Sequence, residues 1–222
     1  MTMTMERQPD FAALRTAMVA SQLRTNAVSD VRVVAAMASV PRERFVSAET
    51  APFAYRDALA TLGGGRSLNL PIATGRLLTE ARLVPTDRVL LIGAASGYTA
   101  AVLAELVAAV VAVESDPALV AMARAALGAD DRVTIVEAPL AQGHAEGAPY
   151  DVLIIDGAVE TVPESLVTQV RADGRILGGL LDRGVSRLAA GRRSEGGFAM
   201  IDFADVDCCR LPGFAAPARF TF

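Results

Sequence analysis

The residues best placed to do chemistry form a small-residue turn after an aliphatic run. The run Val89–Ile92 has no polar alternation, which predicts a strand buried on both faces of a parallel sheet. The turn that follows consists of Gly93, Ala94, Ala95, Ser96 and Gly97. The next segment has the alanine and leucine content of a helix, whose first N–H groups would face a ligand held against the turn. We therefore expect a nucleotide-like cofactor here.

An acidic residue stands where such a cofactor would need one. A second strand is expected over residues 110–114, and it ends at Glu114, with Ser115 beside it. In nucleoside-binding α/β folds, a carboxylate at the end of the second strand accepts the ribose hydroxyls, roughly 20 residues after the glycines. Glu114 fits that role.

The spacing of the turn bears on which cofactor is bound. A pyrophosphate needs bare backbone in the pattern G-x-G-x-x-G, but Ala95 and Tyr98 stand at the second and third glycine positions. A nucleoside without phosphates needs less room, so the turn favours S-adenosylmethionine over a nicotinamide cofactor. A buried strand followed by a glycine turn also occurs in α/β folds that bind no ligand.

Composition narrows the remaining classes. The chain has 222 residues, 52% of them hydrophobic, enough for one domain with a substantial core. The net charge of −4 implies neither a nucleic-acid partner nor a polybasic membrane patch. The adjacent Cys208 and Cys209, expected in a strand region, are too few and too close to build a disulfide framework. Without an apolar leader or an apolar run of about 18 residues, a soluble, cytoplasmic protein is expected. The oligomeric state stays open.

The sequence predicts two helices between residues 11 and 41. Residues 11–24 have helical spacing, and Ser29–Asp30 can cap a second helix that ends at Pro41. The inward positions expected on that second helix are Val31, Val34, Ala35 and Ala38. Residues 41–71 lose periodicity and contain three consecutive glycines, so we expect a long irregular segment with a functional role.

Strands and helices alternate through the rest of the chain. Helices are expected over 72–83, 117–127 and 163–170, and strands over 133–136, 152–155 and 175–181, with a strand end at Asp156–Gly157 and a turn over 172–174. Shorter β pieces are expected over 186–190, 198–203 and 220–222. The pattern predicts an α/β fold with a parallel sheet, helices on both faces and antiparallel edge strands. We expect a single domain over 1–222, with N-terminal helices and a substrate loop in 1–85 and the cofactor-binding core in 86–222.

Six collinear motifs resemble one family. They are Met18-Val19-x-x-Gln22-Leu23, Val40-Pro41-Arg42-x-x-Phe45-Val46, Ala54-Tyr55-x-Asp57, Val89 to Ala104, Ala148-Pro149-Tyr150-Asp151 and Pro163-Glu164-x-Leu166. Their order and spacing up to about Leu177 resemble the protein-L-isoaspartate O-methyltransferases. The resemblance implies a class I methyltransferase with a Rossmann-like, mostly parallel seven-stranded sheet. It also implies S-adenosylmethionine as donor and repair of isoaspartyl residues in a peptide or protein substrate, by esterifying their free carboxylate.

The chain departs from the family pattern at positions that matter. The substrate loop G-x-G-Q-T-I-S-x-P reads here as residues 63–71, with Arg66 for the glutamine, Ser67 for the threonine and Asn69 for the active-site serine. Leu91 stands where the family usually has an acidic residue in the first strand, and we interpret it as a core residue. The family's G-D-G near the adenine is Ala138-Pro139-Leu140, and Asp156-Gly157 lies where V-T-A-A is usual.

Methyl transfer to a carboxylate needs no general base, because that group is ionised above a pKa of about 4. Catalysis then consists of positioning, and the only histidine, His144, is expected to be a loop residue. Asn69, through its amide, and Arg66, through two parallel bonds, are the candidate carboxylate ligands, with Ser67 beside them. The alternatives are a turn residue at Asn69 and a solvated charge at Arg66.

Asp156 is expected either to face the cofactor crevice at the end of its strand or to cap the next turn. Leu91 and Pro139 lack the cofactor contacts that the family's residues make at these two positions. We therefore keep two hypotheses about the function. One is an active carboxyl methyltransferase, and the other is a non-catalytic relative that binds another ligand or a protein. A nicotinamide oxidoreductase is a distant third.

Overall fold

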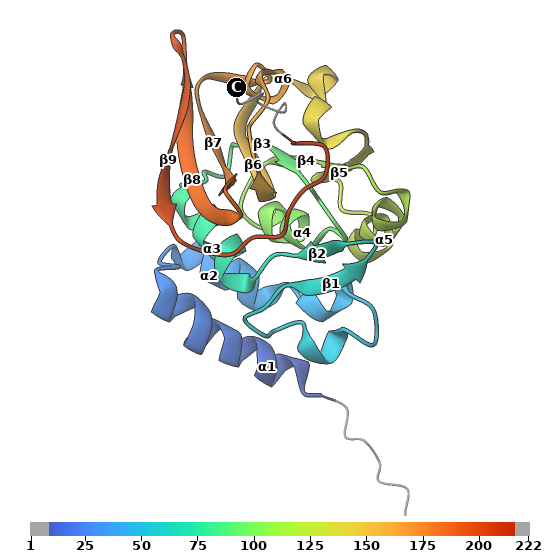
Figure 1. Cartoon of the computed structure of the whole chain (residues 1–222). Coiled ribbons are helices and arrows are strands. Elements are labelled where there is room, and N and C mark those ends of the chain that lie inside the picture. The colour runs from blue at the N-terminus through green and yellow to red at the C-terminus, as the bar shows by residue number, and fades with distance from the viewer. Residues whose placement is uncertain (1–8, 216–222) are drawn as a thin grey trace, which may run out of the picture.

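The computed structural model describes residues 9–215, and it is built around a seven-stranded sheet in the order β5-β4-β3-β6-β7-β8-β9 (Figure 1). The five parallel strands are β3 (Arg88–Ile92), β4 (Ala109–Glu114), β5 (Val133–Glu137), β6 (Tyr150–Val159) and β7 (Val170–Asp182). Two antiparallel strands, β8 (Val185–Ser194) and β9 (Gly197–Ala204), complete the sheet at one edge. The predicted Rossmann-like fold is confirmed.

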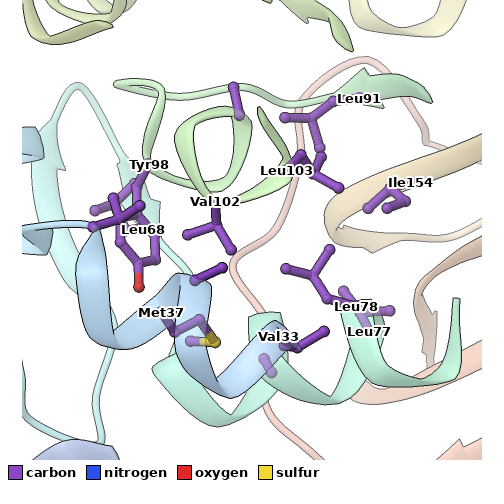
Figure 2. Packing of buried hydrophobic residues seen from close by; sticks show 14 of the residues in the cluster. Val33, Met37, Leu68, Leu77, Leu78, Leu91, Tyr98, Val102, Leu103 and Ile154 are labelled. Atoms are coloured by element: carbon purple, nitrogen blue, oxygen red, sulfur yellow. The ribbon is translucent and has the colours of Figure 1, made fainter. Parts of the chain in front are cut away.

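The aliphatic run at Val89 forms the middle of this sheet, as its composition predicts. β3 pairs in parallel with β4 on one side and β6 on the other, and Leu91 is fully buried among core side chains (Figure 2). Helices α4 (Tyr98–Ala104), α5 (Pro117–Leu127) and α6 (Glu164–Val167) follow strands of the sheet. The order of these strands places the carboxylates that end β4 and lie in β6 on either side of β3.

The expected helix over 117–127 is confirmed, with Pro117 in its first turn. Asp116 caps it, because its Oδ1 accepts hydrogen bonds from the backbone N–H groups of Ala118 and Leu119. α6 is shorter than the expected 163–170 because the chain enters β7 at Val170.

The N-terminal helices form a layer against α3 (Pro71–Glu80). α1 (Phe11–Met18) continues into a π-helical turn over Val19–Leu23 and a 3₁₀ turn over Arg24–Asn26. Asp30 caps α2 (Val31–Ser39), as predicted.

The inward face predicted for α2 was wrong. Val31 is 79% exposed, Ala35 and Ala38 are exposed, and Val34 is only partly buried. Val33, Ala36 and Met37 are buried instead. Figure 2 shows Val33 beside Leu77 and Leu78 of α3, and the Met37 sulfur would lie 3.4 Å from a Cβ atom on Gly75 of the same helix. Small apolar residues surround this helix, so the sequence offers two adjacent apolar stripes, and contact with α3 decides which one is buried.

The segment expected to be irregular contains regular structure. Two 3₁₀ turns, Arg42–Phe45 and Ala51–Phe53, precede a two-stranded hairpin of β1 (Ala60–Gly63) and β2 (Arg66–Leu68). Gly63, Gly64 and Gly65 turn this hairpin with φ values of 92°, 56° and 76°. The strands are too short for a periodicity signal, and the glycines mark the turn between them.

Two expected turns lie inside strands. Asp156 and Gly157 were predicted to end a strand, but β6 continues past them with a register shift between Ile155 and Ala158. Residues 172–174, predicted as a turn, belong to β7. A bulge of this kind redirects a side chain without ending the strand, and the side chain redirected here is that of Asp156.

After β9, an extended segment returns to the sheet. Residues 208–212, which we name the strap, run beside β6: Ala158 donates a backbone hydrogen bond to Cys209 (2.7 Å) and accepts one from Leu211 (3.0 Å). In Figure 1 the red chain leaves β9 and crosses back past the central strands. Cys208 and Cys209 are free thiols and lie outside the named strands, so their expected strand placement was wrong.

Two expectations fall outside these findings. The β piece at 220–222 lies beyond the described residues, and the division of the chain at residues 85 and 86 stays a prediction. Among residues 9–215, no helix combines the length and the apolar character needed to cross a membrane.

Candidate functional site

The turn after β3 has the backbone conformation that its small residues predict. Gly93 and Gly97 have φ values of 80° and 97°, and Ala95 also adopts a left-handed conformation, with φ 50°. Gly97 precedes α4, and a Cβ atom there would lie 3.2 Å from the Cβ of Ala123. The turn is therefore closely packed against α5.

The predicted ribose ligand lies beside this turn. The Glu114 carboxylate is fully buried and accepts backbone hydrogen bonds from Ala95 (2.8 Å), Ser115 (2.7 Å) and Asp116 (3.1 Å). Arg66 adds a two-pronged ion pair, Nη1 to Oε1 at 2.6 Å and Nη2 to Oε2 at 2.8 Å. Against the cost of burial, the bonds from Arg66 and the backbone lower the pKa of Glu114, so the carboxylate is ionised.

Arg66 is thus neither a solvated charge nor free to meet a substrate in this structure. Its side chain is only 7% exposed. It enters from β2 of the hairpin, a segment distant in sequence from Glu114. Ser67 is the next residue, and because side chains alternate along a strand it lies on the opposite face from Arg66 and Leu68. Ser67 is therefore not brought together with the other candidate residues.

A cleft of about 480 Å³ opens next to the Arg66–Glu114 pair. It is lined by Gly64, Gly65, Arg66, Ser115, Asp116, Arg210, Leu211 and Pro212. The glycine hairpin forms one wall, the end of β4 another, and the strap a third. Its size is that of a small-molecule site.

A second carboxylate lies on the other side of β3. Asp156 accepts hydrogen bonds from the Asn69 amide (2.7 Å) and the Thr99 hydroxyl. Burial raises the pKa of Asp156, and the bonds from Thr99 and Asn69 only partly offset this. Asp156 therefore faces inward, toward Asn69, and does not cap a turn.

Asn69 uses both ends of its side chain. While its amide nitrogen donates to Asp156, its oxygen accepts a hydrogen bond from the backbone N–H of Cys209 at 2.8 Å. Asn69 is 1% exposed. It therefore ties the substrate-loop segment to both β6 and the strap.

Sequence reasoning missed Arg42 as a site residue, although it lies in one of the quoted motifs. Arg42 is completely buried, donates from Nε to the carbonyl of Ala54 and from Nη2 to the carbonyl of Asn69, and stacks 4.6 Å from the ring centre of Tyr98. Burial lowers its pKa. Its third nitrogen, Nη1, has no hydrogen-bond partner among the described residues. Arg42 fixes the backbone that carries Asn69.

The strap covers the turn itself, and no sequence signal indicated this. A Cβ atom on Gly93 would lie 2.9 Å from both methyl carbons of Leu211, and one on Gly157 would lie 2.6 Å from Leu211 Cγ. Only glycines at these two positions admit the Leu211 side chain at this depth.

The other predicted residues take varied positions. Ser96 is fully buried and donates its hydroxyl hydrogen bond to the carbonyl of Phe45, away from the cleft. Ala94 is buried, Ala138 donates a backbone bond to the carbonyl of Glu114 (3.1 Å), and Pro139 is exposed beyond β5. His144 lies in a loop, bonded through its backbone to Gln169 and Tyr150.

The residues present fit the nucleoside part of S-adenosylmethionine. An ionised acceptor at the end of β4, next to a cleft of suitable size, is what a ribose diol requires. The turn at Gly93, predicted to face the cofactor, is covered by Leu211. A ligand that contacted this turn would therefore have to displace the Leu211 side chain. No group of acidic, histidine and cysteine side chains among residues 9–215 has the arrangement of a metal site.

Comparisons with known proteins identify the family. A family model described as Protein-L-isoaspartate(D-aspartate) O-methyltransferase (PCMT) matches residues 14–204. A protein-L-isoaspartate O-methyltransferase from Methylorubrum extorquens (strain PA1) is 39% identical over 175 residues, which cover 78% of this chain and 76% of the relative. One from Koribacter versatilis (strain Ellin345) is 35% identical over 178 residues, 78% of this chain and 80% of the relative.

Solved structures show the same fold. A protein-L-isoaspartate O-methyltransferase aligns with a TM-score of 0.78 at 23% identity, over 90% of this chain and 66% of that one. A Plasmodium falciparum protein, described as a complex with S-adenosyl-L-homocysteine, aligns with a TM-score of 0.72 at 17% identity, over 88% and 98% of the two chains.

The sheet order and the solved structures show the class I methyltransferase fold. Within that class, the chain belongs to the protein-L-isoaspartate O-methyltransferase family. The resemblance stated from the six motifs is confirmed, and the matched range extends past Leu177 into β9.

Proposed function

We propose that this chain methylates the free carboxylate of isoaspartyl residues in damaged proteins, acting in the cytoplasm. Its family sets the reaction as methyl transfer from S-adenosylmethionine in protein repair. The observation that carries the assignment is the ionised Glu114 at the end of β4, beside a cleft that fits a nucleoside. The free thiols at Cys208 and Cys209 suit a reducing compartment.

S-adenosylmethionine would supply a methyl group bound to a sulfonium sulfur. When a carboxylate oxygen attacks the methyl carbon, the sulfur leaves as a neutral thioether. The attacking carboxylate is already ionised at neutral pH, so the chain does not have to remove a proton. Its residues must hold the carboxylate in line and keep water out. The site is built for this, because its polar groups are fixed by buried hydrogen bonds and not by solvent.

The roles we assign follow the two sides of β3. Glu114 and Ser115, with Ala138 and Pro139 beyond them, form the side for the ribose and adenine, and the turn from Gly93 to Gly97 faces the sulfur-bearing end. Asn69 and Arg66 are the groups we assign to the substrate carboxylate. Asp156 is a positioning residue, because it holds the amide of Asn69 (2.7 Å).

A second function is favoured by the contacts within the site. Arg66 fills the acceptor positions of Glu114, Leu211 covers Gly93, and Asn69 is engaged at both ends. A relative that has lost catalysis, and keeps the fold to bind another ligand or a protein, would show the same contacts. The two functions differ in whether the methyl donor binds.

Calorimetry with S-adenosylmethionine separates them. We expect saturable binding to the full chain, followed by transfer of labelled methyl to an isoaspartyl peptide and none to the same peptide with a normal aspartate. If millimolar S-adenosylmethionine releases no heat of binding, the enzyme assignment is overturned and the binding-module alternative stands.

Asn69→Ser tests the departure from the family loop. A serine hydroxyl reaches less far and frees the Asp156 carboxylate and the Cys209 N–H from their Asn69 partners. If Asn69 limits catalysis, kcat with the isoaspartyl peptide should rise severalfold. An unchanged kcat, with the variant folded by circular dichroism, would show that position 69 is not the limiting contact.

A further inference from the structure

The Arg66–Glu114 pair and the proposed cofactor compete for the same atoms. The carboxylate receives six hydrogen bonds: two from Arg66, three from backbone N–H groups and a long one (3.4 Å) from the Ser115 hydroxyl. A carboxylate offers about four lone-pair positions. A ribose diol therefore has no free acceptor at Glu114 until some donor leaves.

Arg66 is the donor that can leave. The three backbone N–H groups belong to the turn after β3 and to the end of β4, both fixed by the central sheet. Arg66 instead lies on the two-stranded hairpin, which is outside that sheet. A Cβ atom on Gly63 or Gly65 would meet nothing within 4 Å, so the hairpin turn is open on these sides. Arg66 also lines the cleft that a ligand would enter.

A guanidinium released from Glu114 needs another anion, because an unpaired charge at a mostly buried position is costly. Two other carboxylates lie near it. Asp156 is already bonded to Asn69 and Thr99 through its two oxygens, and Asp116, which lines the same cleft, is held by capping α5 through Oδ1. Asn69 lies three residues after Arg66 on the same segment, and it is the residue proposed to meet the substrate. The carboxylate of an isoaspartyl residue at Asn69 would supply the anion.

We propose that Arg66 is exchanged between two carboxylates: the ribose of the methyl donor takes its place on Glu114, and the freed guanidinium then binds the carboxylate of the isoaspartyl substrate. This inference rests on the proposed function. It makes the two ligands cooperative, since each favours the position of Arg66 that the other requires. Arg66 is therefore both a gate for the cofactor and a ligand for the substrate.

Binding of S-adenosylhomocysteine and of an isoaspartyl peptide, each measured by calorimetry alone and in the presence of the other, tests the exchange. In the wild-type chain, saturating S-adenosylhomocysteine should tighten peptide binding about tenfold, a usual size for coupling between sites. In Arg66→Gln, S-adenosylhomocysteine should bind about tenfold more tightly, since no cation has to be displaced, and the coupling should vanish.

Two further variants complete the test of the exchange. Arg66→Lys keeps the positive charge but cannot form two parallel bonds, so it should fall between wild type and Arg66→Gln in both quantities. Arg44→Gln removes an exposed arginine outside the site and should behave as wild type. Arg66→Lys also provides the answer if Arg66→Gln does not fold.

The outcomes separate this inference from the function beneath it. If the wild-type chain binds S-adenosylhomocysteine and methylates the peptide, but coupling is absent or survives in Arg66→Gln, the exchange is overturned and the function stands. The exchange is also overturned if Arg66→Gln binds S-adenosylhomocysteine no more tightly than wild type. If neither cofactor form binds the wild-type chain, the proposed function itself fails.

Discussion

The two carboxylates on either side of β3 are held in opposite ways. Glu114 ends β4, lies beside an open cleft and is paired with a guanidinium, and its pKa is lowered. Asp156 lies in the bulge of β6, is covered by the strap and is bonded to an amide and a hydroxyl, and its pKa is raised. Both side chains are almost inaccessible to solvent. Desolvation outweighs the hydrogen bonds at Asp156, whereas the bonds from Arg66 and the backbone outweigh it at Glu114, so the pKa values shift in opposite directions.

This difference implies different roles for Glu114 and Asp156. A charge-paired acceptor next to a cleft can exchange its partner for a ligand of the same geometry. A carboxyl held by neutral donors inside the protein instead orders the residues around it. The following experiments, in decreasing order of expected effect, challenge this distinction.

Glu114→Gln should have the largest effect. The change leaves Arg66 mostly buried without its counter-charge, which costs about 3 kcal/mol of unfolding free energy. Urea denaturation measures this, and calorimetry should show that S-adenosylmethionine binding is also lost. Glu105→Gln is the matched control, because Glu105 pairs with Arg132 at an exposed position and should cost less than about 1 kcal/mol. Equal costs in the two variants would contradict the assigned role of the buried pair.

Leu211→Ala tests the closure of the Asp156 end. Removing the side chain that packs on Gly93 and Gly157 should lower the unfolding free energy by about 2 kcal/mol. The same change should tighten S-adenosylmethionine binding, because it opens the space along the turn. Val185→Ala, at a half-exposed position, should change neither quantity. Weaker cofactor binding in Leu211→Ala would mean that Leu211 supports the ligand and does not exclude it.

Asp156→Asn should lower the unfolding free energy by about 1 kcal/mol at neutral pH, less than Glu114→Gln or Leu211→Ala. The asparagine keeps the shape of the aspartate, its oxygen can accept from Asn69, and the Thr99 hydroxyl can turn to accept from its amide. Urea denaturation gives the cost, and the KM for the isoaspartyl peptide reports whether Asn69 has shifted. A loss as large as that of Glu114→Gln would show that the charge of Asp156, and not its shape, holds the site.

The smallest effect is a difference in pH dependence between the two positions. The lowered pKa of Glu114 contributes stability above its ordinary value of 4.5, and this contribution is lost as the pH falls through the folded-state pKa. The deficit of Glu114→Gln should therefore shrink in acid. The raised pKa of Asp156 means that the folded state binds the proton more tightly, so wild-type stability declines as pH rises above the ordinary 3.8. Relative to wild type, Asp156→Asn should gain stability over that range; slopes of the same sign would refute the contrast.

Much of the fold was predictable because its central elements carry strong patterns. The unbroken aliphatic run of β3, the helix α5 over 117–127 and the acidic end of β4 are local features, and each is confirmed. The buried face of α2 was not predictable, because two apolar stripes compete there and only contact with α3 selects one.

The candidate site was less predictable, since its contacts join distant segments. Arg66 and Glu114 were both singled out, but their pairing depends on a hairpin that has hardly any periodicity. Asp156 sits in a bulge that reads as the end of a strand. The Leu211 contact could not be foreseen, because a leucine in a proline-containing segment has no pattern that names its partner.

The strap also has a consequence for how the protein is made. The turn at Gly93 emerges from the ribosome long before Leu211, the residue that later packs on it. Until residues 208–212 have been made, the emerging chain lacks the Leu211 side chain that covers Gly93 and the Cys209 donor to the Asn69 oxygen. A polypeptide cut short before residue 208 would keep every strand of the sheet and still lack the finished site.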